Sequence, residues 1–432
     1  MQIPELYELF VAHPSIETDT RKLKEGDLFF ALKGPNFNGN QFAEKALDAG
    51  AAYAIVDEYK GPDNKRIIKV NDVLTTLQEL AKHHRMQFFN LPGDRQVPFI
   101  AITGSNGKTT TKELIHEVLV TAYTTYTTEG NLNNHIGIPL TILKIKPDAE
   151  MAIIEMGANH QKEIEGYCKY ALPTHCIITN CGKAHLEGFG TEAGVRKAKG
   201  ELYDHLKANK GTAFVMWDYD YLREMSKGIE VIKTYGTHNA DTTGEVKNSS
   251  GLLEVVITGG ADTGTIKTQL VGDYNLPNVL AAVAVGKHFN VPDEKIRTAL
   301  ENYSPSNSRS QLIKKRTNTI ILDAYNANPT SMKAAIENFA KMKGDNKILL
   351  LGGMMELGEN SLSEHQSILA LIDAHAWEAV ILVGGDYNKL KHVYINFENA
   401  GQAKEWFQQQ HFEHKQFLIK GSRSMQMEKI LE

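Results

Sequence analysis

The segment ITGSNGKTTTK, residues 102–112, constrains what this chain can fold into more than any other. It continues the apolar run FIAIT and opens TTTKELIHEVLVTAY, whose length and composition are typical of a helix. A glycine-rich loop between a strand and a helix gathers backbone N–H groups and the positive end of the helix dipole around one anion. The segment therefore predicts a loop that holds nucleotide phosphates.

The residues of this loop have distinct expected roles. Lys108 is expected to reach the β- and γ-phosphates, and the hydroxyl of Thr109 or Thr110 to bind Mg²⁺. The spacing departs from G-x-x-x-x-G-K-[ST], because two residues rather than four separate Gly104 from Gly107. The alternative is a helix cap rich in N–H groups with an exposed lysine. On the nucleotide interpretation, the binding residues are Gly104, Ser105, Asn106, Gly107, Lys108, Thr109 and Thr110.

The chain is long enough for several domains. Its 432 residues correspond to roughly three domains of about 150 residues. Turn-forming segments, LPGDRQVP (91–98) and SPSNSRSQ (304–311), predict domains over 1–96, 97–308 and 309–432. Strand–loop–helix alternation after Pro98 predicts a mainly parallel sheet with helices on both faces, and the last domain repeats this α/β pattern. Alternating residues between 242 and 272 predict antiparallel strands appended to the central domain.

Composition excludes several partners. The formal net charge of −5 argues against nucleic acid or an anionic membrane as the main partner. No secretory signal is visible at the start, and no apolar run approaches the ~20 residues that span a bilayer. The three cysteines contain no CxxC pair, which fits reduced thiols. We expect a cytoplasmic, monomeric protein.

Two polar residues follow the next apolar strands. Glu155 ends MAIIE, where open α/β sheets place their ligands, so a metal ion or a salt bridge to Lys108 would compensate its burial. His185 follows HCIITN in a loop, where a lone histidine is more often solvated than a metal ligand. Cys181 nearby suggests zinc, but no second pair completes such a site.

The residues VRKAKGEL suggest an ordinary surface helix. Lys197 and Lys199 would lie on a solvated face, with Glu201 and Asp204 as local partners. These residues by themselves predict no special role.

Other candidate binding residues lie farther along the chain. Asn131, Asn133 and Asn134 form a turn-like cluster one helix beyond the phosphate loop. Asn278 has no obvious structural task, and Arg309 is expected to clamp phosphate or to pair at the surface. Asp323 ends the strand TIILD, where an acidic residue can hold a ribose hydroxyl.

At these residues the chain resembles the Mur ligase family of peptidoglycan precursor synthesis, which underlies cell wall biogenesis, cell shape and cell division. The short loop TGSNGKTT is the form that the family uses. Within the family, the resemblance is to the members that add D-alanyl-D-alanine. It rests on GNLNNHIGIPLTIL, EMGANHQKEIE, HLEGFGTEAGVRKAKGEL, DAYNANPTSM and LGGMMELGENSLSEH.

The resemblance implies a three-domain enzyme: an N-terminal domain for the UDP end of the substrate, a central P-loop ATPase domain and a C-terminal Rossmann-like domain. Thr109, Glu155 and His185 would bind Mg²⁺, and Lys199 would become a carbamate that bridges to a second Mg²⁺. Lys108, Lys199 and His185 are the implied catalytic residues. Asn278 would face the adenine of ATP, Arg309 its phosphates and Asp323 its ribose.

The resemblance also implies contacts with the other two substrates. Asp19, Thr20 and Arg21 match the family's Asp-Ser-Arg near the UDP, with threonine in place of serine. His135 stands where the family carries an acidic residue, so no role follows there. The remaining expected substrate residues are Asn131, Asn134, Asn326 and Asn328.

The implied reaction joins D-alanyl-D-alanine to UDP-N-acetylmuramoyl-tripeptide through an acyl phosphate at the expense of ATP. Three alternatives stay open. A sister ligase would add one amino acid to the same scaffold, although NANPTSM disfavours this. Folylpolyglutamate synthase shares the ATP core but is expected to lack the N-terminal domain. A non-catalytic nucleotide-binding regulator would not need Lys108, Glu155 and His185 intact.

Overall fold

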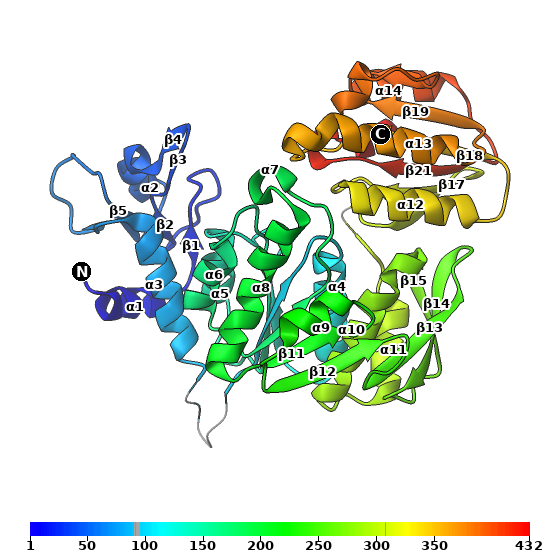
Figure 1. Cartoon of the computed structure of the whole chain (residues 1–432). Coiled ribbons are helices and arrows are strands. Elements are labelled where there is room, and N and C mark those ends of the chain that lie inside the picture. Colours follow the sequence, from blue (N-terminus) through cyan, green and yellow to red (C-terminus); the bar gives the residue numbers. More distant parts are fainter. Residues whose placement is uncertain (90, 92–95, 307) are drawn as a thin grey trace.

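The chain forms three α/β units in sequence order, as Figure 1 shows from blue through green to red. The computed structural model describes residues 1–89, 91, 96–306 and 308–432. Pro92 and Gly93 of the first predicted boundary and Asn307 of the second lie outside the described residues. None of the described helices has the length and apolar character needed to cross a membrane.

The N-terminal unit is a four-stranded parallel sheet in the order β1-β2-β5-β6. Its strands come from short apolar runs, and a small β3-β4 hairpin lies outside the sheet. The strands are β1 (Ile16–Glu17), β2 (Leu28–Phe30), β3 (Lys33–Gly34), β4 (Phe37–Asn38), β5 (Tyr53–Val56) and β6 (Ile67–Lys69). The helices are α1 (Ile3–Ala12), η1 (Gly39–Phe42), α2 (Ala43–Asp48) and α3 (Val73–Met86).

Helix α3 joins this unit to the centre of the molecule. Asp72 caps its first turn by accepting the N–H of Thr75 at 2.6 Å. At the other end, the fully buried Arg85 donates from Nε and Nη2 to the carbonyls of Ala171 and Leu172, both at 3.2 Å. Burial lowers the pKa of Arg85 to about 9. The N-terminal unit is therefore tied to the central unit by a buried cation.

The central unit is a nine-stranded sheet in the order β15-β14-β13-β12-β11-β10-β7-β9-β8. Strands from β8 to β13 pair in parallel, whereas β13-β14 and β14-β15 pair antiparallel, which confirms the strands predicted between 242 and 272. The strands are β7 (Phe99–Thr103), β8 (Thr125–Thr127), β9 (Met151–Glu155), β10 (His175–Ile178), β11 (Thr212–Met216), β12 (Val231–Gly236), β13 (Thr242–Asn248), β14 (Leu252–Gly259) and β15 (Thr265–Val271).

The helices of the central unit cover both faces of its sheet. Along the sheet, the chain moves one way from β7 to β8 and the opposite way in the later crossovers. Because crossovers between parallel strands are right-handed, α4 lies on one face of the sheet and the crossover helices from α5 to α9 lie on the other. Helices α10 and α11 pack against α4. The helices are α4 (Lys108–Leu119), α5 (Gly137–Leu143), α6 (Glu163–Ala171), α7 (Leu186–Phe189), α8 (Glu192–Asn209), α9 (Asp220–Ser226), η2 (Asp273–Asn275), α10 (Leu276–His288) and α11 (Asp293–Asn302).

The C-terminal unit is a six-stranded sheet in the order β16-β17-β21-β18-β19-β20, parallel except for its β16-β17 edge pair. Its strands are β16 (Gln311–Lys315), β17 (Asn318–Asp323), β18 (Lys347–Gly352), β19 (Ala379–Val383), β20 (Ile395–Phe397) and β21 (Gln416–Lys420). The helices are α12 (Pro329–Lys341), η3 (Gly358–Asn360), α13 (Ser361–Asp373), η4 (Gly385–Lys389), α14 (Ala400–Gln409), η5 (Arg423–Met425) and η6 (Met427–Leu431).

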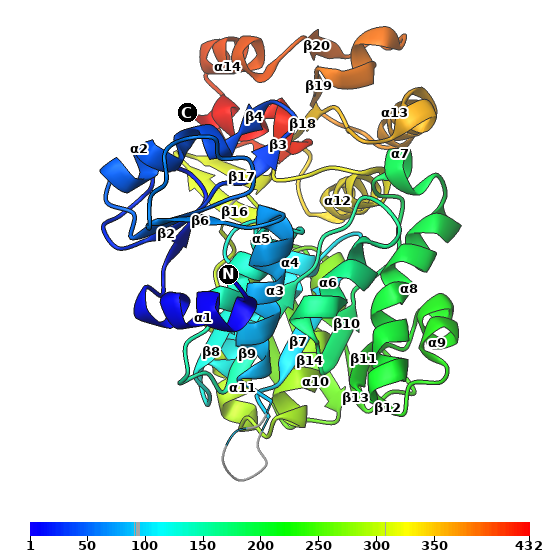
Figure 2. The same ribbon diagram turned by 90° about the vertical axis from the view of Figure 1, so that its left-hand side faces the viewer.

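The predicted α/β fold class is confirmed in all three units. In Figures 1 and 2, the C-terminal unit lies above the central unit, with the N-terminal unit on the left. The contacts between units relevant to function join loops after central strands to the start of α12 and the loop around η3.

Candidate active site

The predicted phosphate loop follows β7, and two glycines allow its path. Gly104 has φ +145° and Gly107, just before α4, has φ +82°, so both lie where side chains are disfavoured. A Cβ at Gly104 would lie 2.0 Å from Thr179 Oγ1, and one at Gly107 would lie 2.7 Å from Asn278 Oδ1. Space and backbone geometry therefore both require glycine.

The loop after β10 holds the phosphate loop in place. Asn180 accepts the N–H of Ser105 with its carbonyl at 2.9 Å and the N–H of Asn106 with Oδ1 at 3.1 Å. The hydroxyl of Thr179 donates to the Asn106 carbonyl at 2.6 Å. Strand register brings these segments together, because Ile178 pairs with Thr103 at the carboxyl ends of neighbouring strands. Such a switch point in strand order is where open α/β sheets bind ligands.

Lys108 folds back over this loop. Its Nζ donates to the carbonyls of Gly104 at 2.7 Å and Ser105 at 3.3 Å rather than to Glu155, so the predicted salt-bridge alternative is wrong. Burial lowers the pKa of Lys108, while the nearby Glu155 carboxylate opposes that shift. The amine therefore lies at the loop in a position to meet phosphate oxygens.

Glu155 ends β9 and is almost fully buried, at 2% exposure. Its two oxygens accept hydrogen bonds from Thr109 Oγ1 at 2.9 Å and from Asn133 Nδ2 at 2.8 Å. A hydroxyl beside a carboxylate is the oxygen donor set that Mg²⁺ takes when phosphates and water complete its shell. Among the described residues no three His, Cys, Asp or Glu side chains converge.

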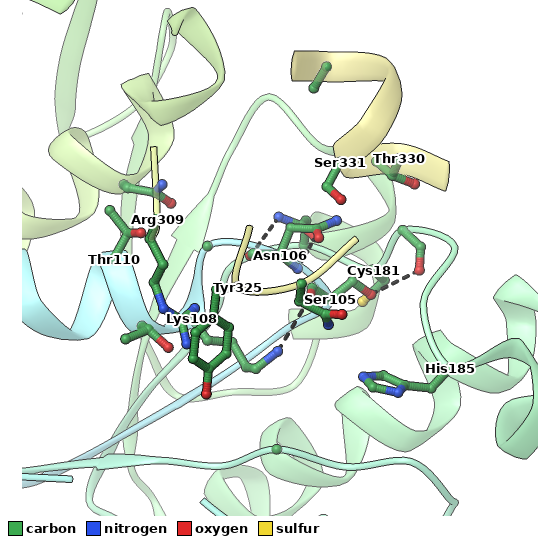
Figure 3. Close-up of a pocket in the computed structure, with 18 of the residues that line it drawn as sticks. Ser105, Asn106, Lys108, Thr110, Cys181, His185, Arg309, Tyr325, Thr330 and Ser331 are labelled. Carbon is green, nitrogen blue, oxygen red and sulfur yellow. Dashed lines mark hydrogen bonds between the residues drawn. The ribbon is translucent and has the colours of Figure 1, made fainter. Parts of the chain in front are cut away.

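His185 does not join the Glu155 cluster directly. It precedes α7 with φ +51°, and its Nδ1 lies 2.5 Å from Oε2 of Glu356 in the C-terminal unit. Its imidazole lines the cleft, as Figure 3 shows. The histidine is thus part of a contact between units as well as a candidate ligand.

Lys199 corrects the interpretation of α8 as an ordinary surface helix. Lys197 is exposed, but Lys199 is only 1% exposed and its Nζ lies 3.4 Å from the Ala158 carbonyl. Burial, and then the neighbouring Lys108, lower the pKa of Lys199 to about 7. Glu201, its expected partner, instead accepts backbone N–H groups at the start of α6. Lys199 is therefore a buried amine that is readily neutral.

Arg309 and Asp323, the predicted nucleotide-binding residues that follow the central domain, lie across the cleft from the phosphate loop. Arg309 stacks on the ring of Tyr325 with its guanidinium carbon 3.5 Å from the ring centre, and its buried Nε has no hydrogen-bond partner among the described residues. Asp323 Oδ2 accepts Lys420 Nζ at 2.6 Å, and Oδ1 accepts the Ser310 N–H at 3.1 Å. The unpaired Arg309 Nε is a donor available to an anion.

Asn278 lies beneath the phosphate loop. Its Oδ1 accepts the hydroxyl of Thr111 at 3.0 Å, and its Nδ2 donates to Asn275 at 2.8 Å. The side chain therefore has a structural task that the sequence did not reveal, although it also lines the cleft.

One cleft of about 1540 Å³ lies between the central and C-terminal units. Figure 3 shows Ser105, Asn106 and Lys108 on one side, with Tyr325, Thr330 and Ser331 contributed by the C-terminal unit. The cleft brings together these predicted site residues: Ser105, Asn106, Gly107, Lys108, Thr109, Thr110, Asn131, Asn134, Glu155, His185, Asn278, Arg309, Asp323 and Asn326.

Six predicted site residues are not among those that line this cleft: Asp19, Thr20, Arg21, Gly104, Lys199 and Asn328. Asp19, Thr20 and Arg21 lie in the N-terminal unit, where Arg21 donates to Asp19 at 2.7 Å and holds its pKa down at about 2. Asn328 caps α12 and donates to Asn106 Oδ1 at 2.8 Å, so it links two units. Lys199 lies buried below the surface of the cleft.

Several site residues escaped sequence reasoning. Lys420 donates to Asp323, Tyr325 stacks against Arg309, and Glu356 contacts His185. Lys420 carried a usable signal, because it ends the apolar strand FLIK as Glu155 ends MAIIE. Glu356 lies within the motif LGGMMELGENSLSEH, but nothing in the sequence indicates its contact with His185.

Family profiles match all three units. "Mur ligase family, catalytic domain" matches residues 14–85, "Mur ligase middle domain" residues 102–286, and "Mur ligase, glutamate ligase domain" residues 308–423. The UDP-N-acetylmuramoyl-tripeptide–D-alanyl-D-alanine ligase of Bacillus subtilis is 38% identical over 384 residues, which cover 88% of this chain and 81% of the relative.

Solved structures agree with the sequence relatives. A MurF crystal structure from Acinetobacter baumannii superposes with a TM-score of 0.85 at 31% identity, covering 96% of this chain and 92% of that one. MurF from Thermotoga maritima in complex with ADP gives 0.84 at 26% identity, covering 96% of each chain. With matched sequence and fold across all three units, the chain belongs to the Mur ligase family.

Proposed function

We propose that the chain is the ATP-dependent ligase that joins D-alanyl-D-alanine to UDP-N-acetylmuramoyl-tripeptide in peptidoglycan precursor synthesis. The observation that carries this proposal is the shared cleft, in which the phosphate loop and Lys108 face Arg309 and Asp323 of the C-terminal unit. The names of the relatives supply the substrates, and the ADP complex of the Thermotoga relative supports an adenine nucleotide at this loop.

The reaction begins with transfer of the γ-phosphoryl group of ATP to the terminal carboxylate of the tripeptide. A new P–O bond forms at the carboxylate, the bond to the β-phosphate oxygen breaks, and ADP leaves. Two anions must approach each other, so the Lys108 amine and the N–H groups of the loop stabilise the charge there. Arg309 Nε offers a further donor from the opposite wall.

The acyl phosphate then reacts with the amine of D-alanyl-D-alanine. The nitrogen attacks the acyl carbon, the C–O bond to phosphate breaks, and an amide, inorganic phosphate and a proton result. The chain's contribution to this step is positioning, because three substrates must meet in one cleft between two units.

Thr109 and Glu155 are the residues that would hold Mg²⁺, with His185 as the expected further ligand. The ion would neutralise phosphate charge and polarise the transferred group. Lys199 would act there as a carbamate, which requires the neutral amine that its burial favours. Activity lost in Lys199→Ala and partly restored by short carboxylic acids would support this role; full activity of the variant without them would discard it.

The remaining assignments follow from the family. Asp323 holds the ATP ribose with Lys420 behind it, and Asn278 faces the adenine. Asp19, Thr20 and Arg21 serve the UDP end, and Asn131, Asn134, Asn326 and Asn328 serve the other substrates. The domains span 1–96, 97–308 and 309–432, and the enzyme acts as a cytoplasmic monomer.

The test is phosphate release from ATP and Mg²⁺ with UDP-N-acetylmuramoyl-tripeptide, with and without D-alanyl-D-alanine. Tripeptides ending in lysine and in diaminopimelate are compared side by side. Release that requires the dipeptide is the expected result. Release with a single amino acid instead would identify a sister ligase, and nucleotide binding without release under any condition would identify a regulator.

A further inference from the structure

The loop between β18 and η3 holds one carboxylate over the central unit. His365 is fully buried, and its Nε2 accepts the N–H of Met354 at 3.0 Å. Ser422 Oγ accepts the next N–H, from Met355, also at 3.0 Å. Glu356 follows with φ +62°, a conformation unusual for a residue with a side chain. Because the N–H groups of Met354 and Met355 are both held by hydrogen bonds, they fix the direction in which the Glu356 side chain projects from the loop.

The Glu356 carboxylate extends from the C-terminal unit to the part of the cleft that contains His185 and the phosphate loop. Its Oε2 lies 2.5 Å from His185 Nδ1, and the side chain stays 48% exposed within the cleft. Its other oxygen accepts no hydrogen bond from the described residues. Lys108, the lysine of the phosphate loop, lies within electrostatic range of this carboxylate. An anion so near a phosphate site would repel the nucleotide unless a cation arrives with the substrates.

Other acidic side chains of the cleft are less suited to that cation. Glu155 is buried between Thr109 and Asn133, and Asp323 is paired with Lys420. Of the described acidic residues lining the cleft, only Asp323 and Glu356 belong to the C-terminal unit. The others accept backbone N–H groups or lie near a basic side chain of their own: Glu163, Glu192, Asp218 and Asp273.

We propose that Glu356 binds the ammonium group of the incoming D-alanyl-D-alanine and so holds its nitrogen beside the acyl phosphate. This inference rests on the proposed function. An α-amino group is largely protonated at neutral pH, so the acceptor arrives as a cation and releases one proton to solvent before its nitrogen attacks. The C-terminal unit thereby supplies the charge that recognises the acceptor, while the central unit supplies the groups that recognise phosphate. Release of His185 from Glu356 accompanies acceptor binding.

The test is Glu356→Gln, which keeps the shape of the side chain and removes its charge. A charge-assisted contact of this kind predicts that KM for D-alanyl-D-alanine rises about tenfold to a hundredfold. KM for ATP and for the UDP substrate should stay the same. Hydroxylamine, which is already neutral at pH 7, replaces the dipeptide in a second assay. Its nitrogen attacks the acyl carbon and phosphate leaves, and this hydroxamate formation should persist in the variant.

Two matched carboxamide variants serve as controls. Glu359→Gln changes the same charge on the same loop at an exposed position. Glu364→Gln removes the partner of Lys183, a 2.6 Å ion pair between the same two units that does not line the cleft. Both should leave KM for the dipeptide within about twofold of wild type, because neither carboxylate lines the cleft.

Three results would overturn the proposal. One is an unchanged dipeptide KM in Glu356→Gln when the wild-type enzyme is active. Another is an equal rise in Glu364→Gln, which would assign the effect to contact between the units. The third is loss of hydroxamate formation with a raised Mg²⁺ requirement, which would make Glu356 a metal-site residue. A wild-type enzyme that ignores D-alanyl-D-alanine would instead overturn the proposed function itself.

Discussion

At the scale of single residues, burial sets the charge of the two lysines next to the phosphate loop. Lys199 is almost fully withdrawn from water at 1% exposure, whereas Lys108 is half-buried at the cleft and lies within electrostatic range of Lys199. Both effects favour the neutral amine of Lys199, whereas Lys108 also faces the Glu155 carboxylate. Lysine is thus expected to have two different chemical roles, one at the phosphate loop and one among the buried residues beneath it.

The buried Lys199 makes a prediction about stability and pH. Its pKa is about 7 in the folded chain, against 10.5 for a free lysine, so the unfolded state binds more protons between these values. The charged amine destabilises the fold fully below about pH 7, by on the order of 5 kcal/mol, and this loss disappears as pH rises towards 10.5. Lys199→Met should therefore be more stable than wild type at low pH and should lose that advantage at high pH.

Melting temperatures measured from pH 6 to 10 without nucleotide, Mg²⁺ or bicarbonate would check this. Lys197→Met, two residues away and exposed, is the matched control and should show no such trend. A constant difference between Lys199→Met and wild type across the range would contradict the lowered pKa.

For Lys108, the prediction concerns turnover rather than stability. Within the part of the chain that the structure describes, its amine donates only to carbonyls of its own loop, so Lys108→Ala should keep nearly the wild-type melting temperature. Loss of the charge that faces the transferred phosphoryl group should lower kcat by roughly 10²–10³-fold. Steady-state phosphate release measures this, with the exposed Lys146→Ala as control. Near-normal turnover would remove Lys108 from the site.

At the scale of elements, the site forms where three neighbouring strands end. β7 leads into the phosphate loop, β9 ends in Glu155, and β10 leads into the loop that holds Ser105 and Asn106. Each strand carries a continuous apolar run because both faces of the sheet are covered. The local sequence of each strand and loop was therefore enough to predict these elements.

The phosphate loop yields a prediction that depends on this packing. Gly104→Ala would place a Cβ 2.0 Å from Thr179 Oγ1 at a φ of +145°, so the loop must shift away from the strand beside it. We expect at least tenfold weaker nucleotide affinity, because several N–H groups would no longer converge on one anion. Gly166→Ala, inside α6 with open space around it, is the control and should be neutral or slightly stabilising. Calorimetric titration with ADP and Mg²⁺ measures both; equal affinity in the two variants would contradict the packing argument.

At the scale of the whole molecule, the two flanking units are attached differently. The N-terminal unit meets the centre along α3, where Arg85 is fully buried between the rings of Phe89 and Phe99. The C-terminal unit meets it near the cleft through single side chains, such as Lys183 with Glu364 and Asn328 with Asn106. A unit held by few contacts can change its position relative to the central unit, as the entry of three substrates requires.

The contact between the N-terminal and central units at Arg85 predicts a specific loss of stability. Arg85→Ala would leave the carbonyls of Ala171 and Leu172 without their donor and open a cavity between aromatic rings. We expect the free energy of unfolding to fall by about 2–5 kcal/mol. Urea unfolding followed by tryptophan fluorescence would measure it, and Met86→Ala, at an exposed position next in the helix, is the control. An equally small effect in both variants would contradict the role of Arg85 in holding the two units together.

Local sequence is enough to predict the fold class, the phosphate loop and the residues at the ends of strands. These features depend on local order, namely an apolar strand, then glycines that permit positive φ, then a helix start, so neighbours in sequence suffice to predict them. The resemblance of several motifs added the family, which the comparisons confirm.

The pairing and burial of charged side chains become visible only in the folded chain. Lys199 looks solvated in sequence, yet α8 packs it inside the central unit. Glu356 and His185 are 171 positions apart in the chain, and Asp323 and Lys420 are 97 apart, so no local pattern relates them. Partners of this kind meet because separate strands and loops end at one cleft, and burial and electrostatic energy depend on distance in space rather than along the chain.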